Sequence, residues 1–99
     1  MLHIVNKSHT ERNALASCLR LAQDGHALLL TEDGIYAATQ AAAAGSGIAA
    51  ATARLKVYVL QPDVQARGME GKLAAGITGI DYGGFVDLVA EHSTNQSWL

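Results

Sequence analysis

The sequence predicts an α/β fold in which helices cover a mainly parallel sheet of four to five strands. Short runs rich in β-branched and aromatic residues alternate with helix-like segments along the chain, which is typical of repeated strand–helix–strand units. One of these runs, 26–31 (HALLLT), is almost continuously apolar, as a strand buried on both faces requires. Because the 99 residues show no linker and no internal repeat, we expect one domain over residues 1–99.

The first strand–helix–strand unit is expected to occupy the opening third of the chain. Its elements are a strand over 2–6, a helix over 11–23 and the apolar strand over 26–31. Ser8 or Thr10 offers a hydroxyl oxygen as N-cap of the helix, and Glu11 in the first turn suits the positive end of the helix dipole. Asp24-Gly25 is typical of a helix end.

The middle of the chain predicts a turn followed by alanine-rich helix. The turn is 32–34 (EDG), and the helix covers 35–44 and 48–53, interrupted by Gly45-Ser46-Gly47. The interruption and the residues after it match the dinucleotide fingerprint G-x-G-x-x-A. Because the residues before the match are helix-like and not a strand, a flexible interhelical turn is favoured over a nucleotide site.

The second half of the chain predicts two further strands and two helices. They cover 55–60 (strand), 63–67 (helix), 77–80 (strand) and a last helix through Phe85, Val86, Leu88 and Val89. Pro62 stands where the first of these strands must stop, and Asp81 is placed to cap the last helix. The polar tail ends in Trp98-Leu99, which predicts that it docks either as an edge strand or against a partner.

Composition and charge narrow the function classes. Only 16% of the residues are charged, whereas a usual globular chain has about 25%. Part of the surface is therefore either helix with uncharged side chains or an interface that is buried against other subunits. The net charge of -2 leaves no positive excess for a phosphate backbone, which disfavours direct binding of nucleic acid. No segment approaches the ~20 apolar residues of a membrane span and no signal peptide is visible, so we expect a cytoplasmic protein.

Candidate metal-binding and acidic residues offer little chemistry. The four histidines, at positions 3, 9, 26 and 92, lack the spacing of a metal site, and neither a metal nor a cofactor is expected. Glu32, Asp33 and Asp81 lie at predicted strand ends, where open α/β sheets place ligands. Capping and turn formation are favoured for these carboxylates over ligand binding.

Cys18 is the one candidate for thiol chemistry. A single cysteine cannot form an internal disulfide, so it is either a passive core or interface residue or a sulfur-handling thiol. It lies within an apolar arc of about 160° on the predicted first helix, which is broad enough to contact a partner as well as the sheet. The site is about two turns from the helix N-terminus, and Arg20 points away from it, so nothing in its own helix activates the thiol.

The order and spacing of several segments resemble the DsrH/TusB family of small sulfur-relay subunits. The resemblance runs nearly end to end and is strongest in EDGIYAA, in YVL-x-PDV-x-ARG and in DY-x-GFVDL. It also includes MLHIVNKS, ERNALASCLRLA and the ending SWL. It implies a three-layer α/β/α subunit that assembles with DsrE/TusD-like and DsrF/TusC-like subunits into a heterohexamer. Such a complex passes persulfide sulfur to a DsrC/TusE-like carrier protein.

The resemblance also bears on the role of the cysteine and on the pathway. In the family the principal sulfur-carrying cysteine belongs to the DsrE/TusD-like subunit, so this chain would be a companion subunit, with Cys18 as a candidate secondary persulfide site. A cysteine in the first helix resembles the DsrH branch, which serves dissimilatory sulfur oxidation, and that branch is favoured over the TusB branch, which serves 2-thiouridine formation in tRNA. Two alternatives remain open: a purely structural subunit and a stand-alone small-ligand-binding domain.

Overall fold

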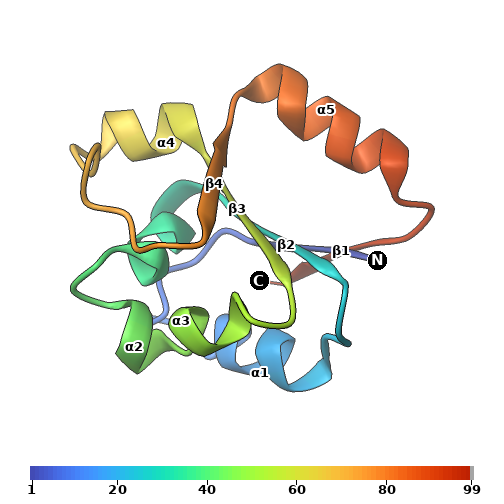
Figure 1. The fold of residues 1–99 in the computed structure, drawn as a ribbon, viewed down its shortest axis with the longest axis horizontal. Helices are drawn as coiled ribbons and strands as arrows, with labels where there is room; N and C mark the ends of the chain where they lie inside the picture. Colours follow the sequence, from blue (N-terminus) through green and yellow to red (C-terminus); the bar gives the residue numbers. More distant parts are fainter. Residues whose placement is uncertain (99) are drawn as a thin grey trace.

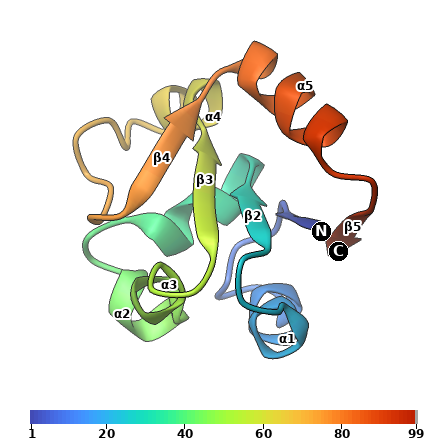
Figure 2. The same ribbon diagram turned by 45° about the vertical axis from the view of Figure 1, so that its right-hand side comes forward.

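The computed structural model describes residues 1–98 and contains one five-stranded sheet in the order β4-β3-β2-β1-β5. All neighbouring strands are parallel. The strands are β1 (Leu2–Val5), β2 (Ala27–Leu30), β3 (Lys56–Leu60), β4 (Ile77–Ile80) and β5 (Asn95–Trp98). Figure 2 shows β3 between β4 and β2 in this order. The predicted α/β fold is therefore confirmed, with a wholly parallel sheet.

Helices lie on both sides of the sheet. They are α1 (Ala14–Leu21), α2 (Ala43–Ser46), α3 (Ile48–Ala51), α4 (Gln61–Ala66) and α5 (Tyr82–Glu91), with a 3-10 helix, η1 (Glu32–Ala38). In Figure 1, α1, α2 and α3 lie below the sheet and α5 lies above it. Among residues 1–98, no helix combines the length and the apolar character needed to cross a membrane.

The sheet separates two apolar clusters of unequal size. Leu28 and Leu30 of β2 face the larger cluster, which α1, α3 and η1 cover. Ala27 and Leu29 face the smaller one, which is closed by Leu88 of α5. Because alternate residues of a strand point to opposite faces, a strand with helices on both sides must be apolar throughout. The uninterrupted ALLL of β2 meets this requirement.

Helix α1 is shorter than the predicted helix 11–23. Its first residue is Ala14, and the expected N-caps Ser8 and Thr10 lie in the preceding loop. The Ser8 and Thr10 hydroxyls are hydrogen-bonded to each other at 2.9 Å, and the Ser8 carbonyl accepts from the Glu11 and Arg12 N–H groups. The predicted start is wrong because local turn hydrogen bonds of serine and threonine occupy the backbone groups that a longer helix would have used.

The predicted helix over 35–44 is also wrong. Residues 35–38 continue the 3-10 helix η1, and a separate short helix begins only at Ala43. Between them the chain pairs with a distant segment: Gln40 N–H donates to the Lys72 carbonyl and Ala74 N–H to the Ala38 carbonyl, both at 2.8 Å. These tertiary hydrogen bonds outweigh the helix propensity of alanine.

The C-terminal tail forms the edge strand β5, which confirms one of its two predicted arrangements. It is parallel to β1, with Leu2 opposite Asn95 and Val5 opposite Trp98. Leu99, the other residue expected to dock, lies outside the described residues. Asp81 caps α5 as predicted, since its carboxylate accepts from the Gly84 N–H at 2.8 Å.

Candidate functional site

Cys18 lies on the sheet-facing side of α1 and is completely buried, with a relative exposure of 0%. It belongs to the larger apolar cluster, together with Leu15 and Ala22 of the same helix face. Most of the apolar arc predicted to reach a partner is therefore used inside this chain, and only Leu21 at its border is strongly exposed. The sulfur atom is enclosed by its own domain and is not presented on an interface of the isolated chain.

The surroundings of Cys18 hold it in the protonated form. Burial raises the pKa of the Cys18 thiol to about 11, although the positive charge of Arg54 acts in the opposite direction. At neutral pH the thiolate fraction is then on the order of one in ten thousand. Since the thiolate is the form that attacks sulfur, the candidate persulfide role has no support from the geometry of the single chain, and it stays a prediction.

Arg54 is a residue whose structural role sequence reasoning missed. It lies between α3 and β3, and its guanidinium donates to the Ala22 carbonyl at 2.7 Å and to the Leu19 carbonyl. Its ion pair with Asp24 measures 3.5 Å between Nη1 and Oδ1. The side chain thus satisfies the free carbonyl groups at the C-terminus of α1, where a cation also suits the helix dipole. No signal in the sequence pairs these segments, which are about 30 residues apart.

The carboxyl ends of β2 and β3 are joined by a polar cluster. Arg67 Nε donates to Asp33 Oδ1 at 2.9 Å, and the Glu32 backbone N–H donates to Asp63 Oδ2 at 2.6 Å. Arg67 Nη1 lies 3.9 Å from Asp63 Oδ1. The hydrogen bond to Asp33 raises the pKa of Arg67. These contacts link η1 to α4, so the EDG and PDV-x-ARG segments are brought together for a structural purpose.

Glycine is required at one point of this edge. Gly34 passes so close to the end of β1 that a Cβ atom would lie 2.5 Å from the Val5 carbonyl oxygen. Beside it, Glu32 has a φ of +49°, a left-handed conformation that non-glycine residues seldom adopt. The Asp63 carboxylate holds the Glu32 N–H in this position. The capping interpretation agrees with the contact of Asp81, whereas the Asp33 carboxylate pairs with Arg67 and caps no helix. The Glu32 side chain is exposed.

Two histidines meet near the amino ends of β1 and β2. His3 Nε2 lies 2.9 Å from His26 Nδ1, and Trp98 Nε1 donates to His3 Nδ1 at 3.1 Å. His26 Nδ1 also accepts from the Gln23 N–H at 3.2 Å, so this nitrogen carries no proton and His3 Nε2 must be the donor. Both rings are consequently neutral, and the three side chains form one directed chain of hydrogen bonds.

The pKa values of both histidines agree with this arrangement. Burial lowers the pKa of His3 below 6.5, with further contributions from His26 and the N-terminal amine. Burial also lowers the pKa of His26, assisted by the N-terminal amine and His92. The chain of hydrogen bonds fixes the edge strand β5 to β1 and to the loop before β2. Sequence spacing could not reveal it, because the two histidines are 23 residues apart.

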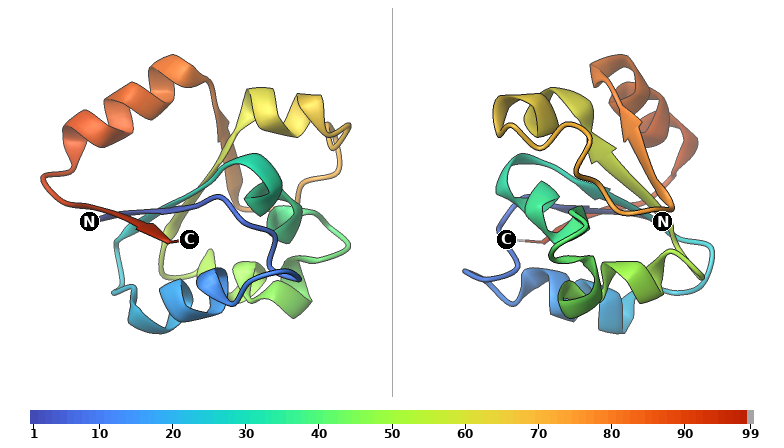
Figure 3. Two further views of the ribbon diagram at one scale, coloured as in Figure 1. Left: turned by 180° about the vertical axis from the view of Figure 1, so that it is seen from behind. Right: turned by 60° about the vertical axis from the view of Figure 1, so that its left-hand side comes forward.

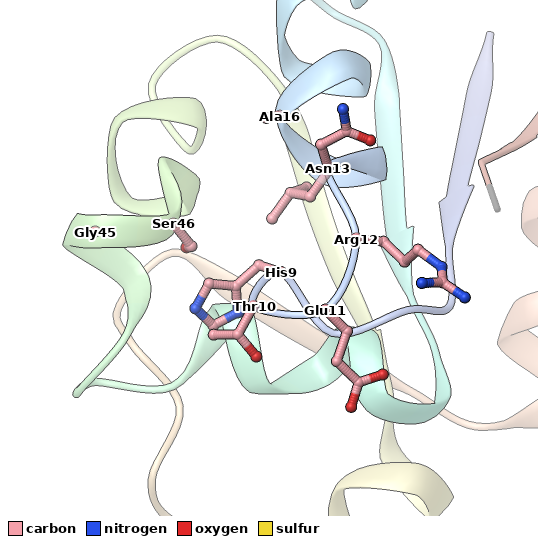
Figure 4. A pocket seen from close by; sticks show the side chains of 9 residues that line it. His9, Thr10, Glu11, Arg12, Asn13, Ala16, Gly45 and Ser46 are labelled. Atoms are coloured by element: carbon pink, nitrogen blue, oxygen red, sulfur yellow. The ribbon is translucent and has the colours of Figure 1, made fainter.

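A pocket of about 410 Å³ opens beside the start of α1 (Figure 4). It lies between residues 9–16 and the end of α2. His9, Thr10 and Ser46 gather on one side of it, whereas the Arg12 guanidinium points away from them. The His9 Nδ1 atom is buried and has no hydrogen-bond partner among the described residues. The pocket is within the size range of small-ligand sites, but these groups form no nucleophile–base pair.

In the glycine-rich segment at the rim of this pocket, Gly45 and Ser46 lie in α2, and Gly47 forms the turn between two helices. Gly47, with a φ of +90°, ends α2 and begins α3. The Ser46 hydroxyl donates to the Ala37 carbonyl at 2.8 Å and accepts from the Ile48 N–H. The favoured reading as an interhelical turn is therefore confirmed. Within residues 1–98, no group of three or more His, Cys, Asp or Glu residues is gathered as metal ligands would be.

Comparisons with known proteins give similarity over nearly the whole chain. The family model described as "DsrH like protein" matches residues 7–95. Two relatives, each named Protein TusB, come from Escherichia coli O81 (strain ED1a) and Escherichia coli O6:K15:H31 (strain 536 / UPEC). Each is 37% identical over 98 residues, which covers 99% of this chain and 100% of the relative.

Solved structures with the same fold are more distant in sequence. A protein of unknown function, MTH1491 from Methanobacterium thermoautotrophicum, superposes with a TM-score of 0.72 at 16% identity, covering 97% of this chain and 95% of the other. The ychN protein from Escherichia coli gives a TM-score of 0.69 at 15% identity, covering 98% and 97%. At these identities the likeness shows the fold alone.

Proposed function

Because the chain belongs to the DsrH/TusB family, we propose that it is a TusB-type companion subunit of a cytoplasmic sulfur-relay complex that supports 2-thiouridine formation in tRNA. The observation that carries this proposal is the 37% identity to Protein TusB over 98 residues, with both chains matched nearly end to end. It favours the TusB branch over the DsrH branch and sulfur oxidation; the preference for the DsrH branch, which rested on the cysteine in the first helix, is not confirmed.

The burial of this cysteine means that its presence is no reason to prefer one branch of the family over the other. Cys18 is fully buried among apolar side chains, and packing alone is enough to account for its presence. A buried thiol therefore does not argue for the DsrH branch. The proposed subunit works through assembly with TusC-type and TusD-type partners, and a thiol of the TusD-type partner would carry the sulfur to a TusE-like carrier protein.

The charge of the chain agrees with a role upstream of the nucleic acid. A net charge of -2 leaves no positive excess for binding tRNA. In the proposed relay the chain contacts only proteins, because the sulfur leaves the complex on a protein carrier.

Deleting the gene in the source organism tests the proposal. We expect 2-thiouridine in total tRNA, measured by mass spectrometry of nucleosides, to fall by about tenfold or more, with oxidation of reduced sulfur compounds unchanged. A plasmid copy should restore it, and so should the Cys18→Ala variant. Normal tRNA thiolation together with lost sulfur oxidation would place the chain in the DsrH branch instead. If the deletion impairs neither tRNA thiolation nor sulfur oxidation, the sulfur-relay proposal as a whole is overturned.

A further inference from the structure

Few side-chain contacts hold the strand β5 to the rest of the chain. Asn95, Gln96 and Ser97 are exposed, and only Trp98 is partly buried, packed against the larger apolar cluster. Within residues 1–98, one side-chain hydrogen bond joins β5 to another element, and it runs from Trp98 Nε1 to His3 Nδ1 of β1. The left view of Figure 3 shows β5 (dark red) alongside β1 (dark blue). Apart from its backbone pairing with β1, the strand therefore depends on Trp98.

The nitrogen atoms of His3 and His26 that could take up a proton already accept hydrogen bonds. His3 Nδ1 accepts from Trp98, and His26 Nδ1 accepts from His3 Nε2 and from the Gln23 N–H. The two remaining ring nitrogens carry the hydrogens of the neutral tautomers. A proton from solvent can therefore add to either ring only at a nitrogen that is now an acceptor, and it breaks a hydrogen bond there.

A proton on either ring acts against the Trp98 contact. On His3 Nδ1, the proton turns the acceptor into a donor, and two N–H groups then face each other across the 3.1 Å between this atom and Trp98 Nε1. On His26 Nδ1, the proton creates a donor 2.9 Å from His3 Nε2. To accept it, His3 must adopt the tautomer that carries its hydrogen on Nδ1, and that hydrogen again faces Trp98. One added proton and one added charge are thus enough.

Positive groups predominate around the two rings. Burial lowers the pKa of both histidines, and the N-terminal amine and the neighbouring histidines lower it further, with His92 acting on His26. Among the elements that pack nearby, α1 carries Arg20, and β3 carries Lys56 opposite Ala27. While β5 is attached, an added proton therefore meets repulsion as well as the loss of a hydrogen bond.

Acidic groups compensate the added charge very little. Asp24, two residues before His26, lies 3.5 Å from Arg54. Asp87 and Glu91 are exposed on α5, and no carboxylate of the described chain raises the pKa of either histidine. Release of Trp98 returns the rings to water, where histidine has a pKa of about 6.5. A fall in pH below this value therefore favours the released state.

We infer that the His3–His26 pair is an acid-sensitive switch: uptake of one proton releases Trp98 and detaches the edge strand β5 from β1, while β1 to β4 stay folded as a sheet. Trp98 is the only residue of β5 in either apolar cluster, so both clusters persist after its release. The released state is therefore distinct from the unfolded chain. The inference is independent of the proposed sulfur relay, because it concerns contacts within this chain.

Tryptophan fluorescence of the full chain tests the inference, because Trp98 is the only tryptophan. Between pH 7.5 and pH 5.0 we expect the acrylamide quenching constant to rise by about twofold or more, with the far-ultraviolet circular dichroism of the helices unchanged. Hydrogen exchange, corrected for the intrinsic effect of pH, should accelerate by about tenfold or more in residues 95–98 and remain slow in residues 27–30 and 56–60.

Two substitutions of His3 should have opposite effects. His3→Asn provides an acceptor oxygen in place of Nδ1 and takes up no proton, so Trp98 should stay protected at pH 5.0. His3→Leu removes the acceptor at every pH, so quenching and exchange should already be raised at pH 7.5. His9→Asn is the matched control, since His9 lies beside the start of α1 and outside this hydrogen-bonded chain, and it should behave as wild type.

The wild-type chain alone can contradict the inference. Equal quenching of Trp98 at the two pH values would overturn it, and so would an equal rise in wild type and in folded His3→Asn. Simultaneous loss of protection in residues 27–30 and 56–60 would show that acid unfolds the whole domain instead of releasing β5. Circular dichroism at pH 7.5 verifies that each variant is folded.

Discussion

At Cys18, the packing that stabilises the fold also suppresses thiol chemistry. Full burial raises the pKa of the thiol to about 11, so we expect the isolated chain to form no persulfide and to react very slowly with alkylating reagents. Incubation with a persulfide donor followed by intact mass spectrometry should show an unchanged mass. In denaturant the same thiol should become reactive at its ordinary rate.

The Cys18→Ala variant separates packing from chemistry. Loss of the buried sulfur atom should lower the free energy of unfolding by about 1 kcal/mol, through the small cavity it leaves. Sulfur transfer by the assembled complex should be unchanged. A gain of one sulfur on the wild-type chain within that complex, absent in Cys18→Ala, would instead show that assembly exposes the thiol and would establish the secondary persulfide site.

The two hydrogen-bonded histidines make stability depend on pH. Folding lowers the pKa of both His3 and His26 from 6.5, so below about pH 6.5 the unfolded chain binds more protons than the folded one. The free energy of unfolding should therefore decrease as the pH falls from 6.5 towards the folded pKa values. Protonation of His26 Nδ1 also removes the acceptor for His3, and protonation of His3 Nδ1 removes the acceptor for Trp98.

Urea unfolding at pH 7.5 and pH 5.0 measures this dependence, with the single tryptophan as reporter. We expect a lower urea midpoint at pH 5.0, by on the order of a few tenths of a molar. His26→Asn keeps an acceptor oxygen but no titrating group, and it should reduce the difference. His9→Asn, outside this hydrogen-bonded chain, is the matched control. An equal pH effect in His26→Asn and wild type would disprove the role of the pair.

At the scale of elements, η1 depends on its close approach to β1. Gly34→Ala places a methyl group 2.5 Å from the Val5 carbonyl oxygen, which cannot move freely because it accepts from the Thr31 N–H at 3.0 Å. We expect the free energy of unfolding to fall by about 3 kcal/mol. Chemical denaturation monitored by circular dichroism gives the value.

Gly45→Ala is the matched control for this substitution. Gly45 lies within α2, and the described chain places no heavy atom within 4 Å of a Cβ added there. Alanine should stabilise the helix by about 0.5–1 kcal/mol. Equal destabilisation by the two substitutions would show that the contact with β1 is not the cause.

The elements that sequence analysis predicted best are those determined by local patterns. The strand over 77–80, the cap at Asp81 and the apolar strand before Glu32 follow from a short run with β-branched residues, from capping chemistry and from burial on two faces, respectively. The alanine-rich middle failed because the backbone around Thr39 pairs with residues 72–74, and no local signal reports such a contact. Helix propensity is a weak guide wherever tertiary hydrogen bonds compete with it.

For the candidate site, the sequence predicted which residue is the candidate and on which helix face it lies, but not what surrounds its side chain. The sequence located Cys18 on the apolar face of a helix, but the enclosure of its sulfur by the core depends on packing between elements. Likewise, the meeting of His3, His26 and Trp98 depends on which strands become neighbours in the sheet. The pattern of elements along the sequence does not reveal the strand order β4-β3-β2-β1-β5. It therefore does not reveal which side chains meet across the sheet.

At the scale of the whole molecule, the position of β5 has a consequence for how the protein is made. Four strands are neighbours in chain order and can pair as the polypeptide emerges from the ribosome, whereas β1 finds its second neighbour only in residues 95–98. This pairing closes a loop of nearly the entire chain, which is entropically the costliest step and slows folding. The nascent domain therefore carries an open edge along its first strand until residues 95–98 have been made and have paired with it, and aggregation with other nascent chains is most favoured during this interval.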